Sequence, residues 1–250
     1  MSWKNFFRTK NTAHLEEALD LGVLHTDIHS HLIPGIDDGS KSMEESLNLI
    51  EQLYELGYRK LIITPHIMND YYKNTPEIIH KGLEELRIQL EKNTIAMEVE
   101  VAAEYMLDDG FEAKIKAGNL LTFGDNYILV EMSYMAEPPN LASLLFELQT
   151  EGYRVVLAHP ERYTYWHNNF NKYQEMVDRG IILQMNINSL TAWYSEASEQ
   201  IAHKLIRADM IRLLGSDLHN QNYLNELKKS RYIPLLKELL ANPKLLNTKL

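Results

Sequence analysis

The sequence repeats one unit along most of its length: an apolar, β-branched run, a polar residue at the end of that run, and a segment with helical periodicity. Seven such units are found, and the residues that end the predicted strands are about 27 to 38 positions apart. Alternating strands and helices predict a parallel sheet whose right-handed crossovers either close it into a barrel or wind it into an open sheet. The predicted strands span residues 23–28, 61–64, 97–103, 127–130, 155–158, 181–187 and 211–214.

The side chains at the ends of these strands favour the barrel. The sixth strand bears Asn186 and Asn188, whereas the other six end in residues that can bind a metal. Only a closed ring brings six strand ends around one mouth, because an open sheet separates its outer ends. We therefore predict an α/β barrel. The six metal-capable ends are His29, His66, Glu104, Glu131, His159 and Asp217.

Composition limits the classes of protein that the chain can belong to. With 250 residues and no evident linker, it fits one barrel domain over residues 25–250, preceded by an N-terminal extension over residues 1–24. That extension has no apolar run long enough for an export signal or a membrane span, so we expect a cytoplasmic protein without a transmembrane segment. The net charge of -10 argues against a general nucleic-acid binder. Without cysteine, any metal is left to imidazole and carboxylate ligands.

The end of the first strand carries the densest group of metal-capable side chains. In an extended segment, side chains two residues apart point to the same side, so His29 and His31 can present two imidazoles to one point. Asp37 and Asp38 follow closely, although either carboxylate could simply form a turn before Gly39. A His-x-His pair alone favours a structural role, so a metal assignment depends on the other strand ends.

Nine metal-capable side chains are predicted to converge on the barrel mouth. Taken singly, each could have a structural role, such as pairing with an arginine. Together they would be very costly in charge and desolvation unless cations lay among them. The set exceeds the needs of one ion, so we predict two or three divalent ions and a bridging role for Glu104. Imidazole and carboxylate ligands are compatible with manganese, iron or zinc. The predicted ligands are His29, His31, Asp38, His66, Glu104, Glu131, His159, Asp217 and His219.

A site of this kind fits the hydrolysis of a phosphate ester. Two ions about 3.5 to 4 Å apart can share one hydroxide, lower its pKa toward about 7 and stabilise both ends of an in-line displacement at phosphorus. Arg162, three residues after His159, is predicted to bind phosphate oxygens, with a surface ion pair to Glu161 as its alternative role. Arg162 and Asp38 are the predicted catalytic residues.

Four aromatic residues lie just beyond the ends of the fourth and fifth predicted strands. They could stack against an aromatic substrate, or they could simply pack the loops that hold them. These residues are Tyr134, Tyr163, Tyr165 and Trp166.

The motifs together resemble those of the polymerase-and-histidinol-phosphatase (PHP) superfamily, most of all its bacterial manganese-dependent protein-tyrosine phosphatases of capsule and exopolysaccharide operons. The resemblance runs in order and in spacing from Thr26 to about His219. The motifs that carry it are His29-Ser30-His31, Asp37-Asp38-Gly39, Pro65-His66, Ala103-Glu104, Val130-Glu131, His159-Pro160-Glu161-Arg162 and Ser216-Asp217-Leu218-His219.

The resemblance implies a distorted seven-stranded (β/α)7 TIM-like barrel with a three-metal centre. It implies hydrolysis of phosphotyrosine on the tail of a tyrosine autokinase that controls polysaccharide export, and it is compatible with a homo-oligomer. One departure concerns a second arginine, which many members have shortly after the Asp-x-His motif, whereas this chain has none in residues 220–224. The implied ligands are His29, His31, Glu104 and Asp217 for one ion, Asp38, His66 and Glu104 for a second, and Glu131, His159 and His219 for a third.

Three functions stay open at the level of sequence. The first is a tyrosine phosphatase in which a metal-bridging hydroxide attacks phosphorus. The second is a small-molecule phosphomonoesterase of the histidinol-phosphatase type, and the third is a regulatory module with a structural metal cluster. The complete ligand set argues against the third function, and a comparison of substrates would separate the first two.

Overall fold

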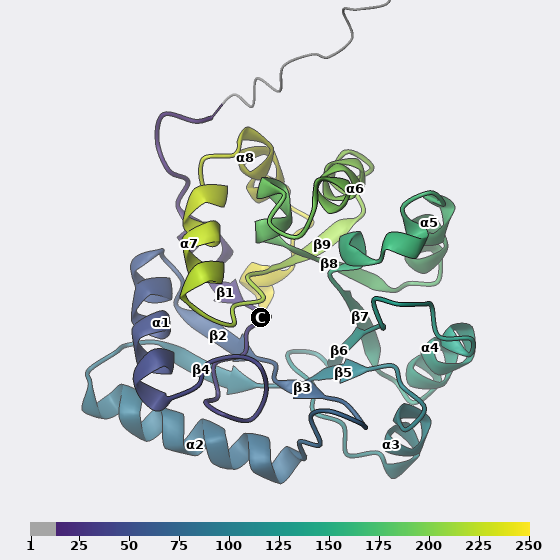
Figure 1. Ribbon diagram of the computed structural model, residues 1–250, viewed down its shortest axis with the longest axis horizontal. Helices are drawn as coiled ribbons and strands as arrows, with labels where there is room; N and C mark the ends of the chain where they lie inside the picture. Colours follow the sequence, from purple (N-terminus) through teal and green to yellow (C-terminus); the bar gives the residue numbers. More distant parts are fainter. Residues whose placement is uncertain (1–13) are drawn as a thin grey trace, which may run out of the picture.

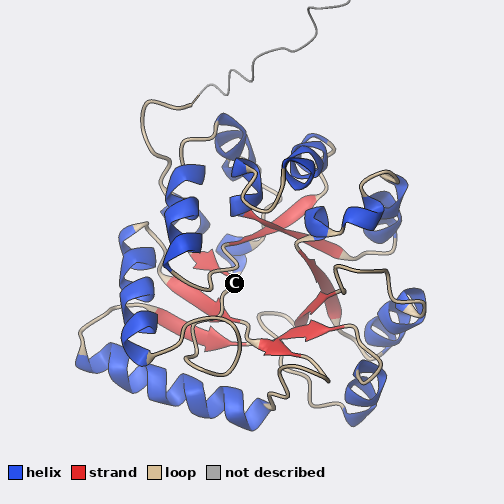
Figure 2. Cartoon of the chain, in the orientation of Figure 1, coloured by secondary structure: helices blue, strands red, loops and turns tan. Residues whose placement is uncertain are grey.

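The computed structural model describes residues 14–250, so the part of the predicted N-terminal extension in residues 1–13 lies outside the described residues. A ring of strands occupies the centre of the molecule, and helices surround it (Figures 1 and 2). Every pair of neighbouring strands within the sheets is parallel. The predicted α/β barrel is confirmed.

The strands form two sheets, because two of the seven predicted strands are each split into two segments. One sheet has the order β1-β2-β4 and the other has the order β3-β5-β6-β7-β8-β9. β2 continues as β3 after Pro65, which has no backbone N–H for a strand ladder. β4 continues as β5 after Ala102 and Ala103. The strands are β1 (Thr26–Asp27), β2 (Lys60–Ile63), β3 (His66–Ile67), β4 (Glu98–Val101), β5 (Glu104–Met106), β6 (Tyr127–Glu131), β7 (Arg154–Ala158), β8 (Ile182–Asn186) and β9 (Ile211–Gly215).

Backbone hydrogen bonds just beyond β1 and β9 close the ring. Asp217 N donates to His29 O at 2.9 Å, and His31 N donates to Leu218 O at 2.9 Å. These segments carry four of the predicted metal ligands, His29, His31, Asp217 and His219. Closing the barrel therefore also brings part of the candidate site together.

The helices pack against the outside of the ring. α1 begins after Ser42, whose side chain accepts a hydrogen bond from the backbone of Glu45, and α2 begins after Thr75 with Pro76 at its first position. No helix in residues 14–250 is long and apolar enough to cross a membrane. The helices are α1 (Met43–Glu55), α2 (Pro76–Lys92), α3 (Phe111–Ala117), α4 (Leu141–Thr150), α5 (Asn171–Asp178), α6 (Glu196–Arg207), α7 (Gln221–Ser230) and α8 (Pro234–Leu240).

All seven predicted strands differ from the structure in at least one bound, and the first differs most. The first was expected over residues 23–28, but Leu21–Leu24 forms the 3-10 helix η1 and only Thr26–Asp27 pairs with β2. A short buried run of apolar residues has the same pattern in a helical turn as in a strand. The sixth strand ends at Asn186, and Asn188 lies in the 3-10 helix η4 (Ile187–Thr191).

Apolar side chains fill both faces of the strands. A large core lies between the strands and the helices, and it includes Leu21 and Leu24 of η1. A smaller core occupies the other face of the strands, inside the ring. The C-terminal 3-10 helix η5 (Asn247–Lys249) closes the amino-terminal end of the barrel, where Leu246 and Leu250 pack against the inner core. The opposite end holds the polar residues described next.

Candidate metal centre

The nine predicted ligands lie together at the carboxyl ends of the strands. All except Asp38 are buried, and the Asp38 side chain is 51% exposed. Seven of the nine line one hollow with a volume of about 360 Å³, together with Arg162. The structure therefore brings the predicted residues to one mouth.

Donor atoms in this centre approach one another as closely as the ligands of a shared ion. His66 Nδ1 lies 3.1 Å from Glu104 Oε2 and 2.9 Å from Glu131 Oε1. None of these three buried atoms has a hydrogen-bond partner among the described residues. Ligand atoms that bind one ion at about 2.1 Å lie about 3.0 to 3.4 Å apart. The contacts therefore fit a shared cation better than a hydrogen-bonded cluster.

The donors fall into overlapping groups. Glu104 and His66 each belong to two groups, and this overlap is compatible with the predicted bridging role of Glu104. His219 lies with Asp38 and His66, whereas the family resemblance implies a place beside Glu131 and His159. The division of donors among ions stays a prediction. The groups are His31, Asp38, His66 and His219; His29, His31 and Glu104; and His66, Glu104 and Glu131.

Hydrogen bonds around the centre determine which nitrogen of His29 carries its proton. The Asp217 carboxylate can only accept, so the Asn186 side chain must turn its Nδ2 toward Asp217 Oδ2, at 2.7 Å. Asn186 Oδ1 then accepts from Gln184 Nε2 at 2.9 Å, and Gln184 Oε1 accepts from His29 Nδ1 at 2.9 Å. A neutral His29 therefore presents the lone pair of Nε2 to the centre.

Asp37 fixes His31 in the same way. His31 Nδ1 donates to Asp37 Oδ2 at 2.9 Å, so a neutral His31 also presents the lone pair of Nε2. The two Nε2 atoms of His29 and His31 are 3.3 Å apart. Two lone pairs at this distance repel each other unless a proton or a metal cation lies between them. Histidines whose outer nitrogen is held by a carboxylate or amide oxygen are typical of metal sites.

The pKa shifts of residues in the centre also indicate that cations or protons lie among the carboxylates. Burial disfavours the charged form of His66, but the carboxylates of Glu131 and Glu104 outweigh it and raise its pKa to about 9. Burial also disfavours the Glu104 carboxylate, yet His29 and His66 hold its pKa well below the usual range. Without metal ions the centre would retain protons, and divalent cations would displace them.

Arg162 forms part of the wall of the hollow. Its Nη1 donates to Asp217 Oδ2 at 3.0 Å, and its guanidinium lies 4.5 Å from the ring centroid of Tyr134 and 4.1 Å from that of Tyr194. The alternative ion pair with Glu161 does not form, because the Glu161 carboxylate is buried and accepts hydrogen bonds elsewhere. The other N–H groups of Arg162 remain for the oxygens of a phosphate.

Among the four predicted aromatic residues, Tyr134 alone lines the hollow. Its hydroxyl lies 3.4 Å from His159 Nε2. The rings of Tyr163, Tyr165 and Trp166 pack against one another instead. Loop packing therefore explains three of these residues, and Tyr134 is left as a candidate contact for a substrate ring.

Three residues around the centre were not predicted from the sequence. Gln184 and Asp37 hold the two histidines, and Tyr223 lines the hollow. A polar Gln184 inside an otherwise apolar strand was the available signal for the first. For Asp37 the sequence leaves both a metal-capable carboxylate and a turn open; the structure shows the turn, with Gly39 N donating to Asp37 Oδ1 at 3.0 Å, together with the bond to His31. Tyr223 lies in the segment where many members of the family have a second arginine.

Local backbone conformation also sets the geometry of the site. His159 and Asp217 have φ values of 34° and 52°, in the left-handed region that side chains rarely adopt. Such conformations cost about 1 to 3 kcal/mol each and persist where surrounding contacts enforce them, often at functional sites. A Cβ at Gly39 would lie 2.0 Å from His31 O, so the turn after Asp38 requires glycine.

Comparisons with known proteins identify the family that this chain matches. The family model described as "Capsular polysaccharide synthesis, CpsB/CapC" matches residues 25–232. The chain is 30% identical over 195 residues to the tyrosine-protein phosphatase YwqE of Bacillus subtilis, covering 78% of this chain and 77% of that protein. It is 28% identical over 201 residues to the tyrosine-protein phosphatase CpsB of Streptococcus pneumoniae, covering 78% of this chain and 82% of that protein.

The fold agrees with a solved structure of these relatives. A chain from the crystal structures of YwqE from Bacillus subtilis and CpsB from Streptococcus pneumoniae, described as unique metal-dependent tyrosine phosphatases, has a TM-score of 0.79 and is 28% identical. The match covers 88% of this chain and 89% of that chain.

Proposed function

Because the chain belongs to the CpsB/CapC family of capsular polysaccharide synthesis, we propose that it is a metal-dependent protein-tyrosine phosphatase. The approach of His29 Nε2 to His31 Nε2, 3.3 Å apart with both outer nitrogens occupied, is the observation that carries the proposal. A metal cation between these histidines would remove the repulsion of their lone pairs. The related tyrosine phosphatases YwqE and CpsB, whose crystal structures are described as those of metal-dependent enzymes, support the assignment.

The nine donors fit two or three divalent ions, manganese first and iron or zinc as alternatives. Their four carboxylates carry up to four negative charges, which two divalent ions would balance. When bound, such ions activate water as a nucleophile at neutral pH and polarise phosphoryl oxygens. Asp38 would act as the ligand nearest to solvent, at the edge where a substrate enters.

Side chains of the protein would then bind the substrate and take up charge. The guanidinium of Arg162, held by Asp217 and by two tyrosine rings, is positioned to bind non-bridging oxygens of the phosphate. The ring of Tyr134 would contact the substrate ring. The leaving tyrosinate has a pKa near 10, so its departure needs less help from a general acid than an alkoxide would, and we name none.

The biological substrate is proposed to be the phosphotyrosine tail of a tyrosine autokinase in capsule or exopolysaccharide synthesis. The match to the capsular polysaccharide family supports this choice. A cytoplasmic location would follow from such a substrate, and a homo-oligomer would be compatible with it.

Substrate preference tests the proposal. In manganese, kcat/KM for a phosphotyrosine peptide is expected to exceed that for histidinol phosphate at matched concentrations, and the reverse order would favour the small-molecule phosphatase instead. The variant His159→Ala is expected to lose turnover on both substrates, because His159 Nε2 lies 2.9 Å from Glu104 Oε1. The variant His167→Ala is a matched control, since its ring bonds only to a backbone oxygen outside the hollow. Unchanged turnover in His159→Ala would contradict the assignment of that ligand.

A further inference from the structure

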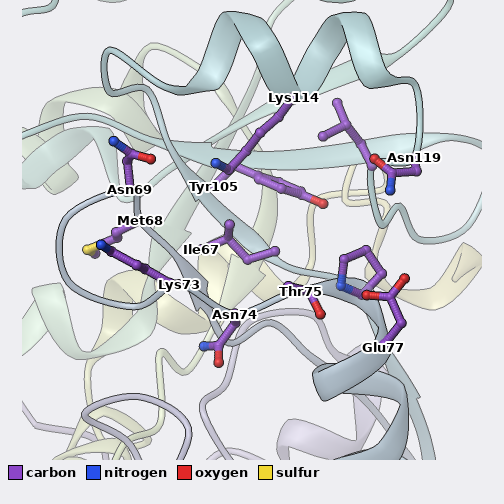
Figure 3. A pocket seen from close by; sticks show the side chains of 12 residues that line it. Ile67, Met68, Asn69, Lys73, Asn74, Thr75, Glu77, Tyr105, Lys114 and Asn119 are labelled. Atoms are coloured by element: carbon purple, nitrogen blue, oxygen red, sulfur yellow. The ribbon is translucent and has the colours of Figure 1, made fainter.

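A second hollow lies beside the metal centre on the same rim of the barrel. It has a volume of about 340 Å³ and is bounded by the end of β3, the start of α2, and α3 (Figure 3). The buried side chains of Ile67 and Tyr105 give it an apolar floor. Met68 lines this hollow and the hollow of the metal centre, so the two share a wall. We call the second hollow the side pocket.

Hydrogen bonds hold the loop that forms one wall of the side pocket. The carboxylate of Asp108 accepts from Asn69 N at 2.6 Å and from Gly110 N at 3.0 Å, and it thereby ties the loop to the segment that starts α3. At the other end of the loop, Asn74 Nδ2 donates to the backbone oxygens of Ile36 and His66 at 3.0 and 2.9 Å. The pocket is therefore formed before any ligand arrives, which lowers the ordering cost of binding.

The polar rim of the side pocket is dominated by two lysines. Lys114 extends from α3 on one side and Lys73 comes from the loop on the other (Figure 3). Within residues 14–250, no ion pair or hydrogen bond occupies either ammonium group. Lys116, two residues further along α3, instead pairs with Glu112.

The acid that lines the pocket does not neutralise these lysines. Glu77 lies in the first turn of α2, where hydrogen bonds from the Thr75 side chain and from its own backbone N–H lower its pKa. Its carboxylate is thus directed to the start of its helix. Two lysines and one glutamate leave the lining of the side pocket with a net positive charge, on a chain whose net charge is -10.

We propose that the side pocket binds an acidic side chain of the phosphotyrosine substrate, two or three residues from the phosphotyrosine. The inference rests on the proposed phosphatase function. An extended peptide advances about 3.3 Å per residue, so such a side chain is displaced by about 7 to 10 Å, one pocket away from the metal centre. The aliphatic stem of a glutamate would contact Ile67 and Tyr105, and its carboxylate would pair with Lys73 and Lys114. The local charge attracts an acid and disfavours a basic side chain.

Phosphotyrosine peptides with one movable glutamate test this inference. The peptides have alanine at all other positions, and the glutamate is placed at each position from three before to three after the phosphotyrosine. The protein is loaded with manganese and assayed at low salt. A glutamate at one of these positions is expected to raise kcat/KM by about five-fold over the all-alanine peptide, because it lowers KM. Added salt should reduce this gain. The double variant Lys73→Ala/Lys114→Ala should abolish the gain, and Lys114→Glu should shift the preference to a lysine-containing peptide.

Two controls separate this inference from the proposed function. Lys116→Ala removes a neighbouring charge that pairs with Glu112 and does not line the pocket, so it should retain the full preference for glutamate. Free phosphotyrosine is too short to reach the side pocket, so the double variant should hydrolyse it at the rate of the unmodified protein. Hydrolysis of all peptides without positional preference, or a preference that survives the double variant, would overturn the side-pocket inference alone. A failure to hydrolyse any phosphotyrosine substrate would instead overturn the proposed function.

Discussion

At the carboxyl ends of the strands, a nitrogen of His66 lies about 3 Å from carboxylate oxygens of Glu104 and Glu131, and none of these buried atoms has a hydrogen-bond partner within the described part of the chain. At the amino ends, by contrast, every polar side-chain atom of Asn247 has a hydrogen-bond partner. Asn247 Oδ1 accepts from Leu214 N at 3.0 Å, and its Nδ2 donates to Thr26 O and Leu214 O at 3.0 and 2.8 Å. The same strands thus end in a strained, charged cluster at one rim and in a satisfied network at the other.

The two ends of the barrel therefore have different roles. The amino end holds the ring together through hydrogen bonds and apolar packing against η5. The carboxyl end instead gathers buried imidazoles and carboxylates whose charges cations or protons can balance. Barrels of this class generally show the same division, with catalysis at the carboxyl ends and stability at the amino ends.

The largest expected effect comes from the centre of the metal cluster. Glu104→Gln keeps the size of the side chain but removes the charge that His29, His66 and His159 surround, so kcat on an aryl phosphate should fall by about 1000-fold or more. The midpoint of thermal unfolding in chelator should fall, because His29 and His66 lose the buried carboxylate whose pKa they lower. Glu112→Gln, on the exposed side of α3, is the matched control. Activity within tenfold of the original would break the proposed contrast between the two rims.

A smaller loss is expected from the residue that orients His31. Asp37→Asn weakens the hydrogen bond to His31 Nδ1, so manganese affinity should fall by about 10- to 100-fold while the fold is retained. Titration of the ion-free protein with manganese in a calorimeter measures the affinity. The control Asp70→Asn changes an exposed carboxylate outside the hollow and should leave it unchanged. Equal affinities for both variants would show that Asp37 merely forms a turn.

Metal affinity should also depend on pH. In the ion-free protein the pKa of His66 is raised to about 9, so below that pH its imidazole is protonated and the proton must leave when a metal binds. Manganese affinity should therefore weaken as pH falls, by about tenfold per pH unit for each proton displaced. Calorimetry at pH 7.5 in buffers of different ionisation enthalpy counts those protons. Binding without proton release would refute the role of His66 as a ligand that trades a proton for a cation.

The smallest effect on activity is expected at the amino end of the barrel. Asn247→Ala leaves the backbone groups of Leu214 and Thr26 unsatisfied, so the free energy of unfolding should fall by about 1 to 3 kcal/mol. At a temperature where the variant is folded, kcat should change by less than about twofold, since η5 does not reach the metal centre. Urea unfolding and steady-state kinetics measure the two quantities, with exposed Thr248→Ala as control. A folded variant with a tenfold lower kcat would show that the two ends are coupled.

The features that could be predicted from the sequence are those that follow from local sequence patterns. Strand ends at His66, Glu131 and Asp217 follow apolar runs with clear boundaries, so their convergence could be predicted from the closure of the barrel alone. The start of the first strand could not be predicted, because the buried Leu21 and Leu24 have the same pattern in a helical turn as in a strand.

What sequence reasoning missed depends on contacts between distant segments. The bond from Gln184 to His29 joins residues 155 positions apart, and that from Asn247 to Thr26 joins residues 221 positions apart. Neither leaves a periodic signal. The side pocket is of the same kind, since Lys73 and Lys114 come together only when α3 packs beside the loop after β3.

Metal content tests the central claim most directly. Protein purified without chelator is analysed for its elements, and hydrolysis of phosphotyrosine is measured before and after treatment with chelator. The nine clustered donors predict two or three divalent ions per chain, loss of turnover on their removal and its return with manganese. Less than one ion per chain together with full turnover in chelator would contradict the account.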